Sequence, residues 1–172
     1  MPAPYVPQAV ANIFLQKSIE GRHPVDHMKL QKLVYFTHGL YLAATALDGP
    51  AQPLVNEYFE AWEYGPVCPG LYREFAEFGR DPITRLGLAY APEFGTRVAA
   101  LTHDADPILK SVSDHVWVRY GDKRSMELSN LTHKVGGAWD RARQEAKGLR
   151  GKDIPNEYIL EDFKPFVHKK AG

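Results

Sequence analysis

The chain has 172 residues, one cysteine, and 21 basic against 21 acidic side chains, for a formal net charge of zero. This length fits one domain that can fold without a disulfide or a metal. The lack of a basic surplus argues against direct nucleic-acid binding, because phosphate neutralisation supplies most of the affinity in such complexes.

The compartment expected for this chain is the cytoplasm. A lone thiol suits a reducing environment, and the opening MPAPYVPQ lacks the basic and apolar blocks of an export signal. No apolar run reaches the ~18 residues that a membrane span needs. We therefore expect no membrane association.

Two helices are predicted in the first fifty residues. The first runs from about Pro7 to Ile19. The second follows Asp26, whose carboxylate can cap it, and continues to about Leu47. Apolar residues cover nearly the whole circumference of the second helix, which is typical of a buried central helix.

The middle of the chain is predicted to hold a strand, a turn and a short helix. Residues 54–64 are rich in Val, Tyr, Phe and Trp without a helical stripe. Gly and Pro at 65–66 predict a turn, and Pro69 suits the first turn of a helix that reaches about Phe78. Residues 84–89 are expected to pair with the earlier strand in a small sheet.

Four further helices are predicted in the second half, at 106–120, 125–131, 139–146 and 156–163. Asp106 and Asn156 can cap the first and the last of them. The predicted fold class is mainly α: a compact single domain of six to seven helices around a buried central helix, with a small β element. We expect one domain over residues 1–172, with a core at about 8–165 and frayed termini.

Cys68 is the candidate nucleophile of the chain, with His38 or His133 as its base. Such chemistry needs a thiolate and a base within hydrogen-bond reach. The alternative is that Cys68 is simply a small buried apolar residue. The sequence contains no HExxH, no CxxC pair and no phosphate-binding glycine motif, so neither a metal nor another cofactor is expected.

Lys32 lies inside the most apolar helix, where its ammonium group needs a partner or a path to water. We hypothesise an ion pair with Glu60 that fixes the strand against the helix. The alternative is that the Lys32 side chain extends to solvent.

Three other residues have structural interpretations. His38 is expected to be a hydrogen-bonded interior histidine, and His133 to lie at a helix end beside Thr132. Gly39 in mid-helix costs roughly 0.5–1 kcal/mol relative to Ala. We therefore expect another element to pack closely against the backbone at Gly39.

Three pieces of the sequence together resemble one protein family. They are LQKLVYFTHG (30–39), FEAWEYGPVCPGLY (59–72), and LTH at 131–133 with a Trp six residues later. The chain resembles the Panacea domain, the SocA-like family of bacterial and phage antitoxins that includes phage-associated GepA-type proteins. The likeness extends from about residue 8 to 165. The matched positions, to which no chemical roles are assigned, are Leu30, Gln31, Lys32, Leu33, Tyr35, His38, Gly39, Glu60, Ala61, Trp62, Gly65, Pro66, Thr132, His133 and Trp139.

The resemblance implies an antitoxin and not an enzyme. Its partner would be a cognate protein toxin, encoded by the adjacent gene and neutralised by direct binding. An alternative is a proteolytic adaptor that delivers the toxin to a ClpXP-type protease. A third possibility is an enzyme that reverses the damage caused by the toxin, with His38, Cys68 or His133 in its site.

The stretch from Phe59 to Phe75 holds the candidate contact residues. Trp62, Tyr64, Tyr72 and Arg73 surround the Gly-Pro pair, and protein interfaces favour Trp, Tyr and Arg as anchors. We expect these four residues to contact the partner. The alternative is that most of them belong to the core.

Overall fold

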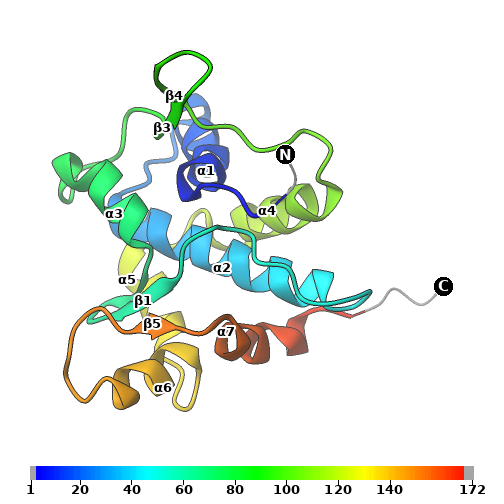
Figure 1. Cartoon of the computed structure of the whole chain (residues 1–172). Coiled ribbons are helices and arrows are strands. Elements are labelled where there is room, and N and C mark those ends of the chain that lie inside the picture. The colour runs from blue at the N-terminus through cyan, green and yellow to red at the C-terminus, as the bar shows by residue number, and fades with distance from the viewer. Residues whose placement is uncertain (1–2, 169–172) are drawn as a thin grey trace.

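A computed structural model describes residues 3–168 of the chain, so only the outermost residues of the termini expected to fray, 1–2 and 169–172, lie outside this range. Within it, seven α-helices and two small antiparallel sheets form the fold, with helix α2 (His27–Thr45) through its middle (Figure 1). The mainly helical class and the central helix are confirmed.

Helix α2 is buried over most of its length. Asp26 caps it as expected, because its carboxylate accepts a hydrogen bond from the Lys29 amide at 2.8 Å. Every residue from 29 to 43 is buried. This explains the apolar residues around the whole circumference, since a helix covered on all sides has no face for water.

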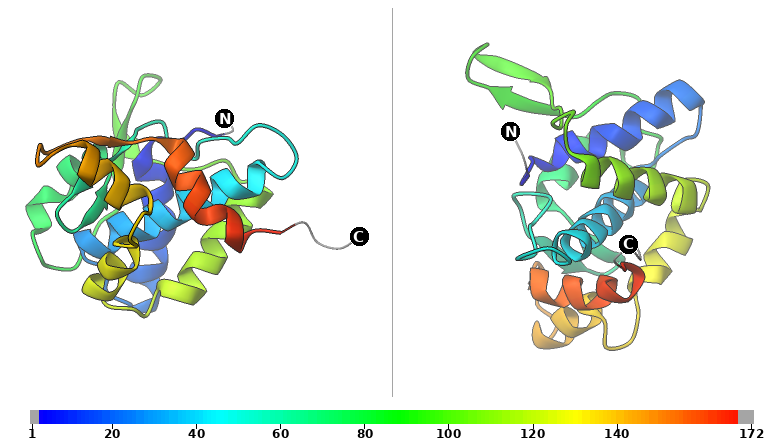
Figure 2. Two further views of the ribbon diagram at one scale, coloured as in Figure 1. Left: turned by 90° about the horizontal axis from the view of Figure 1, so that it is seen from below. Right: turned by 90° about the vertical axis from the view of Figure 1, so that its right-hand side faces the viewer.

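Six helices surround α2 or pack on the layer that covers it. Helices α1 and α4 lie on one side of α2, and α6 and α7 lie on the other (Figures 1 and 2). Their bounds are α1 (Pro7–Gly21), α3 (Pro69–Phe75), α4 (Pro107–Tyr120), α5 (Ser125–Thr132), α6 (Ala138–Glu145) and α7 (Asn156–Phe163). Two 3₁₀ turns follow α3 and α7, at Ala76–Phe78 and Lys164–Phe166.

Neighbouring aromatic residues of α2 join different layers of the core. The Phe36 ring lies 4.7 Å from the Tyr120 ring of α4. The Tyr35 ring lies 5.2 Å from Phe59 and 5.8 Å from Phe163 of α7. These tilted and edge-on contacts tie α2 to a helix on each side and to the first strand.

The larger sheet has the order β2–β1–β5, with strands β1 (Phe59–Trp62), β2 (Gly65–Val67) and β5 (Asp153–Ile154). The smaller sheet is a hairpin of β3 (Leu88–Ala91) and β4 (Thr96–Ala99), which projects from the helical body (Figure 2). Both sheets are antiparallel.

Two predictions about the sheets are wrong. Gly65 and Pro66 begin strand β2 and are not the turn, which lies one step earlier at 63–64. Residues 84–89 do not pair with β1. The neighbouring segment pairs locally as β3–β4, and the free edge of β1 is taken by β5, more than ninety residues further along the chain.

The start of helix α7 also differs from expectation. Pro155 occupies the position before the helix, and Asn156 is its first residue with no capping bond. The Asn156 side chain is instead used in the core, where its Oδ1 accepts a hydrogen bond from His38 Nε2 at 2.9 Å.

Gly39 marks the closest approach between α2 and α7. A Cβ atom at Gly39 would lie only 2.2 Å from the Phe163 ring, well inside van der Waals contact. The expectation that an element packs tightly against this glycine is confirmed.

Replacing Gly39 with alanine is predicted to destabilise the chain, although alanine is intrinsically the better helix former. The forced shift of Phe163 should cost about 1–3 kcal/mol of unfolding free energy, which exceeds the gain of ~0.5–1 kcal/mol in helix propensity. Urea unfolding measures the difference. Gly49→Ala is the control, because nothing lies within 4 Å of a Cβ atom there. A stability equal to or above that of the wild type for Gly39→Ala would contradict the prediction.

Candidate functional site

The stretch from Phe59 to Phe75, here called the corner, comprises β1, β2 and α3 and is fixed by side chains of three helices. Every second backbone carbonyl from residue 62 to residue 68 accepts a hydrogen bond from a side chain. The pairs are Trp139 Nε1 to Trp62 O at 2.7 Å, Ser129 Oγ to Tyr64 O at 2.7 Å, Lys32 Nζ to Pro66 O at 3.1 Å, and Gln31 Nε2 to Cys68 O at 3.2 Å. Buried carbonyls need such partners, so these donors fix the path of the corner.

Gly65 is required where the corner meets α2 and α5. Its φ of +106° lies in a region that side-chain-bearing residues rarely adopt. A Cβ atom there would also lie 2.5 Å from Thr132 Oγ1 and 2.8 Å from Lys32 Cε. Four positions of the family motif, namely Gln31, Lys32, Gly65 and Trp139, thus have a structural explanation in the path of this backbone.

The predicted Lys32–Glu60 ion pair is wrong. Lys32 is 1% exposed and donates to the Pro66 carbonyl, so it does not reach solvent either. The Glu60 carboxylate accepts from the Trp62 indole at 2.6 Å. The reason is strand alternation: Ala61 of β1 points into the core, so its neighbours Glu60 and Trp62 lie on the opposite face.

The outer face of the corner carries the predicted contact residues. Tyr64 is 51% exposed, Tyr72 is 44% exposed, and Arg73 is exposed as well. Trp62 is half-buried, and its ring lies 4.8 Å from the ring of Tyr72. The corner thus brings Trp62 and Tyr72 into contact, and the four residues lie at the surface and not in the core.

Cys68 lacks the environment of a nucleophile. It is fully buried, and its Sγ lies 3.6 Å from the Glu57 carboxylate. Burial and the negative charge of Glu57 raise the pKa of the Cys68 thiol to about 12. Near neutral pH the group is therefore a protonated thiol, in agreement with the interpretation of Cys68 as a small buried residue.

His38 is an interior histidine, as expected. The Val55 amide donates to its Nδ1 at 3.4 Å, so Nε2 carries the proton that is donated to Asn156. Burial lowers the pKa of His38 to about 4, although the Asn156 hydrogen bond acts in the opposite direction. Both ring nitrogens of this neutral imidazole are occupied by structural hydrogen bonds.

His133 directly follows the last residue of α5, at the helix end as expected, and stacks on Trp139 with ring centroids 4.0 Å apart. Burial, Lys32 and Arg143 lower its pKa. Its Nε2 is buried without a hydrogen-bond partner within residues 3–168. The neighbouring Thr132 hydroxyl donates to the Ser129 carbonyl, which satisfies a group at the same helix end.

The candidate catalytic residues are not joined to one another. Across residues 3–168, no hydrogen bond links Cys68 to His38 or to His133. The described part of the chain likewise holds no group of three or more His, Cys, Asp or Glu residues that could bind a metal ion. None of its helices has the length and apolar character needed to cross a bilayer.

Two residues that hold the corner were not identified from the sequence. Ser129 meets its carbonyl partner 65 positions away. Glu57 accepts a hydrogen bond from the Gly70 amide at the start of α3, at 2.9 Å. The glycine at position 70 was a possible sign of close packing, because a Cβ atom there would lie 2.2 Å from the Glu57 carboxylate. The partner of such a glycine cannot be read from local sequence.

The buried amine of Lys32 should give the chain a distinctive pH dependence. Burial lowers the pKa of Lys32 from 10.5 to about 7, and Asp26 only partly offsets this effect. Between these values the unfolded chain binds more protons than the folded chain. The unfolding free energy therefore rises with pH, by up to about 1.4 kcal/mol per pH unit, and this contribution is lost as the pH falls to about 7.

We predict that Lys32→Met removes this rise in stability. Urea unfolding at pH 7 and at pH 9 should show the wild type gaining stability relative to the variant. Lys110→Met is the matched control, because the Lys110 side chain is 77% exposed. Parallel pH profiles of the wild type and Lys32→Met would rule out a depressed pKa for this amine.

Comparison with known proteins finds a family match over the part of the chain that contains the corner. Residues 30–140 match the family described as "Antitoxin SocA-like, Panacea domain", a shorter span than the expected 8–165. Antitoxin SocA of Caulobacter vibrioides (strain NA1000 / CB15N) is 32% identical over 133 residues, which cover 77% of this chain and 68% of the relative. No solved structure matches the chain. The matched residues include the whole corner together with Gln31, Lys32, Ser129 and Trp139, and the chain belongs to the SocA-like antitoxin family with a Panacea domain.

Proposed function

We propose that the chain is a cytoplasmic antitoxin that neutralises a cognate protein toxin by direct binding at the corner. Family membership supports the antitoxin role and implies a toxin as partner. The toxin is expected to be the product of the adjacent gene. The outer face of the corner, with Trp62, Tyr64, Tyr72 and Arg73, is the proposed contact surface.

The observation that carries this proposal is the exposure of large aromatic groups on a fixed backbone. Tyr64 and Tyr72 are about half exposed, and the carbonyls at 62, 64, 66 and 68 are held by side chains beneath them. Trp, Tyr and Arg dominate the energetic centres of interfaces. A backbone that is already ordered loses little entropy on binding, which leaves more of the contact energy for affinity.

The buried polar groups favour binding over chemistry. A nucleophile needs an ionised or activated group that a substrate can reach. The Cys68 thiol is buried and protonated, and both nitrogens of His38 are engaged. Direct masking of the toxin therefore explains the corner better than an enzyme that repairs the damage.

The double variant Tyr64→Ser/Tyr72→Ser tests the contact surface. Loss of interface anchors of this kind costs about 2 kcal/mol or more, so we expect at least ~30-fold weaker binding to the purified product of the adjacent gene. Both side chains are exposed, so the fold should persist. Isothermal titration calorimetry measures the affinity, and urea unfolding checks the fold.

Val118→Ser on α4 is the matched control, because Val118 is 83% exposed and belongs to another surface. Unchanged affinity of the corner variant would reject the corner as the contact surface. Absence of any complex with the wild type would reject direct binding altogether. Neutralisation that disappears in cells lacking a ClpXP-type protease would indicate delivery for degradation in place of masking.

A further inference from the structure

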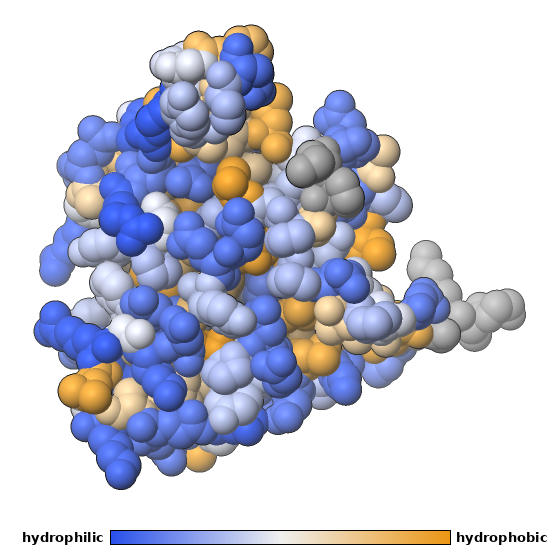
Figure 3. Space-filling model, viewed as in Figure 1, coloured by the Kyte–Doolittle hydropathy of each residue, from blue (hydrophilic) through white to orange (hydrophobic). Residues whose placement is uncertain are grey.

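The β3–β4 hairpin projects from the helical body (Figures 1 and 2), and its surface combines hydrophilic and hydrophobic residues (Figure 3). Two of its aromatic side chains are exposed. Tyr90 on β3 is 65% exposed, and Phe94 in the connecting turn is 68% exposed. An isolated two-stranded hairpin is at best marginally stable in water. This hairpin therefore needs support from outside its own four-residue strands.

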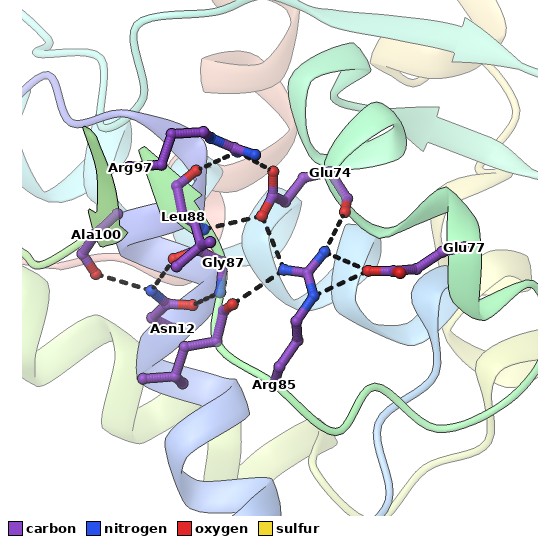
Figure 4. Close-up of polar contacts among 9 residues, drawn as sticks. Asn12, Glu74, Glu77, Arg85, Gly87, Leu88, Arg97 and Ala100 are labelled. Atoms are coloured by element: carbon purple, nitrogen blue, oxygen red, sulfur yellow. Dashed lines mark hydrogen bonds and ion pairs between the residues drawn. The ribbon is translucent and has the colours of Figure 1, made fainter. Parts of the chain in front are cut away.

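That support comes from α3 and is concentrated at the base of the hairpin (Figure 4). The Glu74 carboxylate, only 5% exposed, accepts hydrogen bonds from the Leu88 amide and from Arg85, both at 2.9 Å. It also pairs with Arg97 of β4. Arg85 in turn lies over the rings of Phe75 and Phe78.

A second support comes from helix α1 (Figure 4). Asn12 Nδ2 donates to the Gly87 and Ala100 carbonyls at 2.9 and 2.8 Å, and Asn12 Oδ1 accepts from the Gly87 amide at 2.6 Å. These bonds hold the two residues that flank the hairpin. Together with the Glu74 cluster, they set the direction in which the hairpin leaves the body.

The hairpin keeps one strand edge unpaired. The amide and the carbonyl of Leu88 bond to the side chains of Glu74 and Arg97, so they point away from β4. In an antiparallel ladder the pairs alternate, so Arg97 and Ala99 direct their own amides and carbonyls to the outer edge of β4. No hydrogen bond to these groups on that edge occurs within residues 3–168. Such an edge can accept another strand.

The exposed area argues against a second copy of this chain as the occupant. At ~200 Å² per aromatic residue, Tyr90 and Phe94 together present roughly 250 Å² of surface. A stable interface needs about 800 Å² from each partner. Contact between two hairpins would therefore fall well short, and an occupant must also bind elsewhere on the molecule.

Helix α3 connects the hairpin to a second proposed contact surface, the corner. Tyr90 and Arg97 are cross-strand partners and share one face of the hairpin, and Arg97 reaches Glu74 on α3. The residues just before Glu74 are Tyr72 and Arg73 of the corner. One short helix, α3, thus anchors the hairpin through Glu74 and carries Tyr72 and Arg73 of the corner on its exposed side.

We propose that the toxin-binding surface continues from the corner across α3 onto this hairpin, where an extended segment of the toxin pairs with the outer edge of β4 as a third strand. Its apolar side chains contact Tyr90 and Phe94. This inference rests on the proposed function, because the occupant is the toxin. Main-chain hydrogen bonds would supply affinity. The two aromatic residues would supply selectivity, as side-chain contacts do in other cases of strand addition.

The test is Ala99→Pro, with Ala99→Ser as the matched control at the same position. Proline removes the outward amide of β4 but no hydrogen bond of the β3–β4 ladder, whereas serine keeps that amide. We expect at least 10-fold weaker binding of the purified adjacent-gene product by Ala99→Pro, and wild-type affinity for Ala99→Ser. Tyr90→Ser/Phe94→Ser should weaken binding by a similar factor without a change in urea unfolding.

Hydrogen exchange gives an independent readout on the wild-type protein. The amides of Arg97 and Ala99 should exchange at least 10-fold more slowly in the complex than in the free chain. Wild-type affinity of both hairpin variants, with the corner variant still weakened, overturns this inference and leaves the proposed function standing. A wild-type chain that does not bind the toxin overturns both. A dimer of the free chain that Ala99→Pro dissociates assigns the edge to a second copy and also overturns the inference.

Discussion

The supply of hydrogen-bond donors to the corner is the constraint on which the rest of the structure depends. A short strand pair that passes over a helical core buries carbonyls which neither a helix nor a wide sheet can satisfy. This chain meets that need with side chains, one for each second carbonyl, from α2, α5 and α6. The order of the helices around α2 follows in part from this requirement, because each donor must lie beneath its acceptor.

Lys32 is the most demanding of these donors. A buried amine loses its hydration, and a single carbonyl at 3.1 Å does not replace it, which is why burial lowers its pKa so strongly. An apolar residue would avoid that penalty but would leave the Pro66 carbonyl without its donor. The buried Lys32 amine therefore lowers the unfolding free energy near neutral pH, while its hydrogen bond to Pro66 defines the path of the backbone. Because Gly65 packs against the same side chain, the lysine and the glycine act as one unit.

The sequence predicts the helical core well because the signals there are local. Asp26 caps α2 through an amide three positions away, and the apolar circumference of α2 indicates burial. Gly39 indicates close packing, although the sequence does not identify its partner, Phe163 of α7. The predicted sheet partners are wrong because pairing is decided by distant segments: β5, the partner of β1, follows α6 in the chain. The predicted ion pair of Glu60 with Lys32 is wrong, although strand alternation alone places Glu60 on the face of β1 away from α2. The use of Asn156 by His38, 118 positions away, has no local signal.

Helix α3 carries two proposed contact residues and a supporting residue at three consecutive positions. Tyr72 and Arg73 face outward, whereas the carboxylate of Glu74 is enclosed and braces the hairpin. The proposed contact residues and the residue that supports the hairpin are therefore different side chains of the same helix. A relative could acquire a new target through outward substitutions alone, since the internal brace would stay intact. Grafting the outward residues from one antitoxin onto another is then a practical route to exchange their targets.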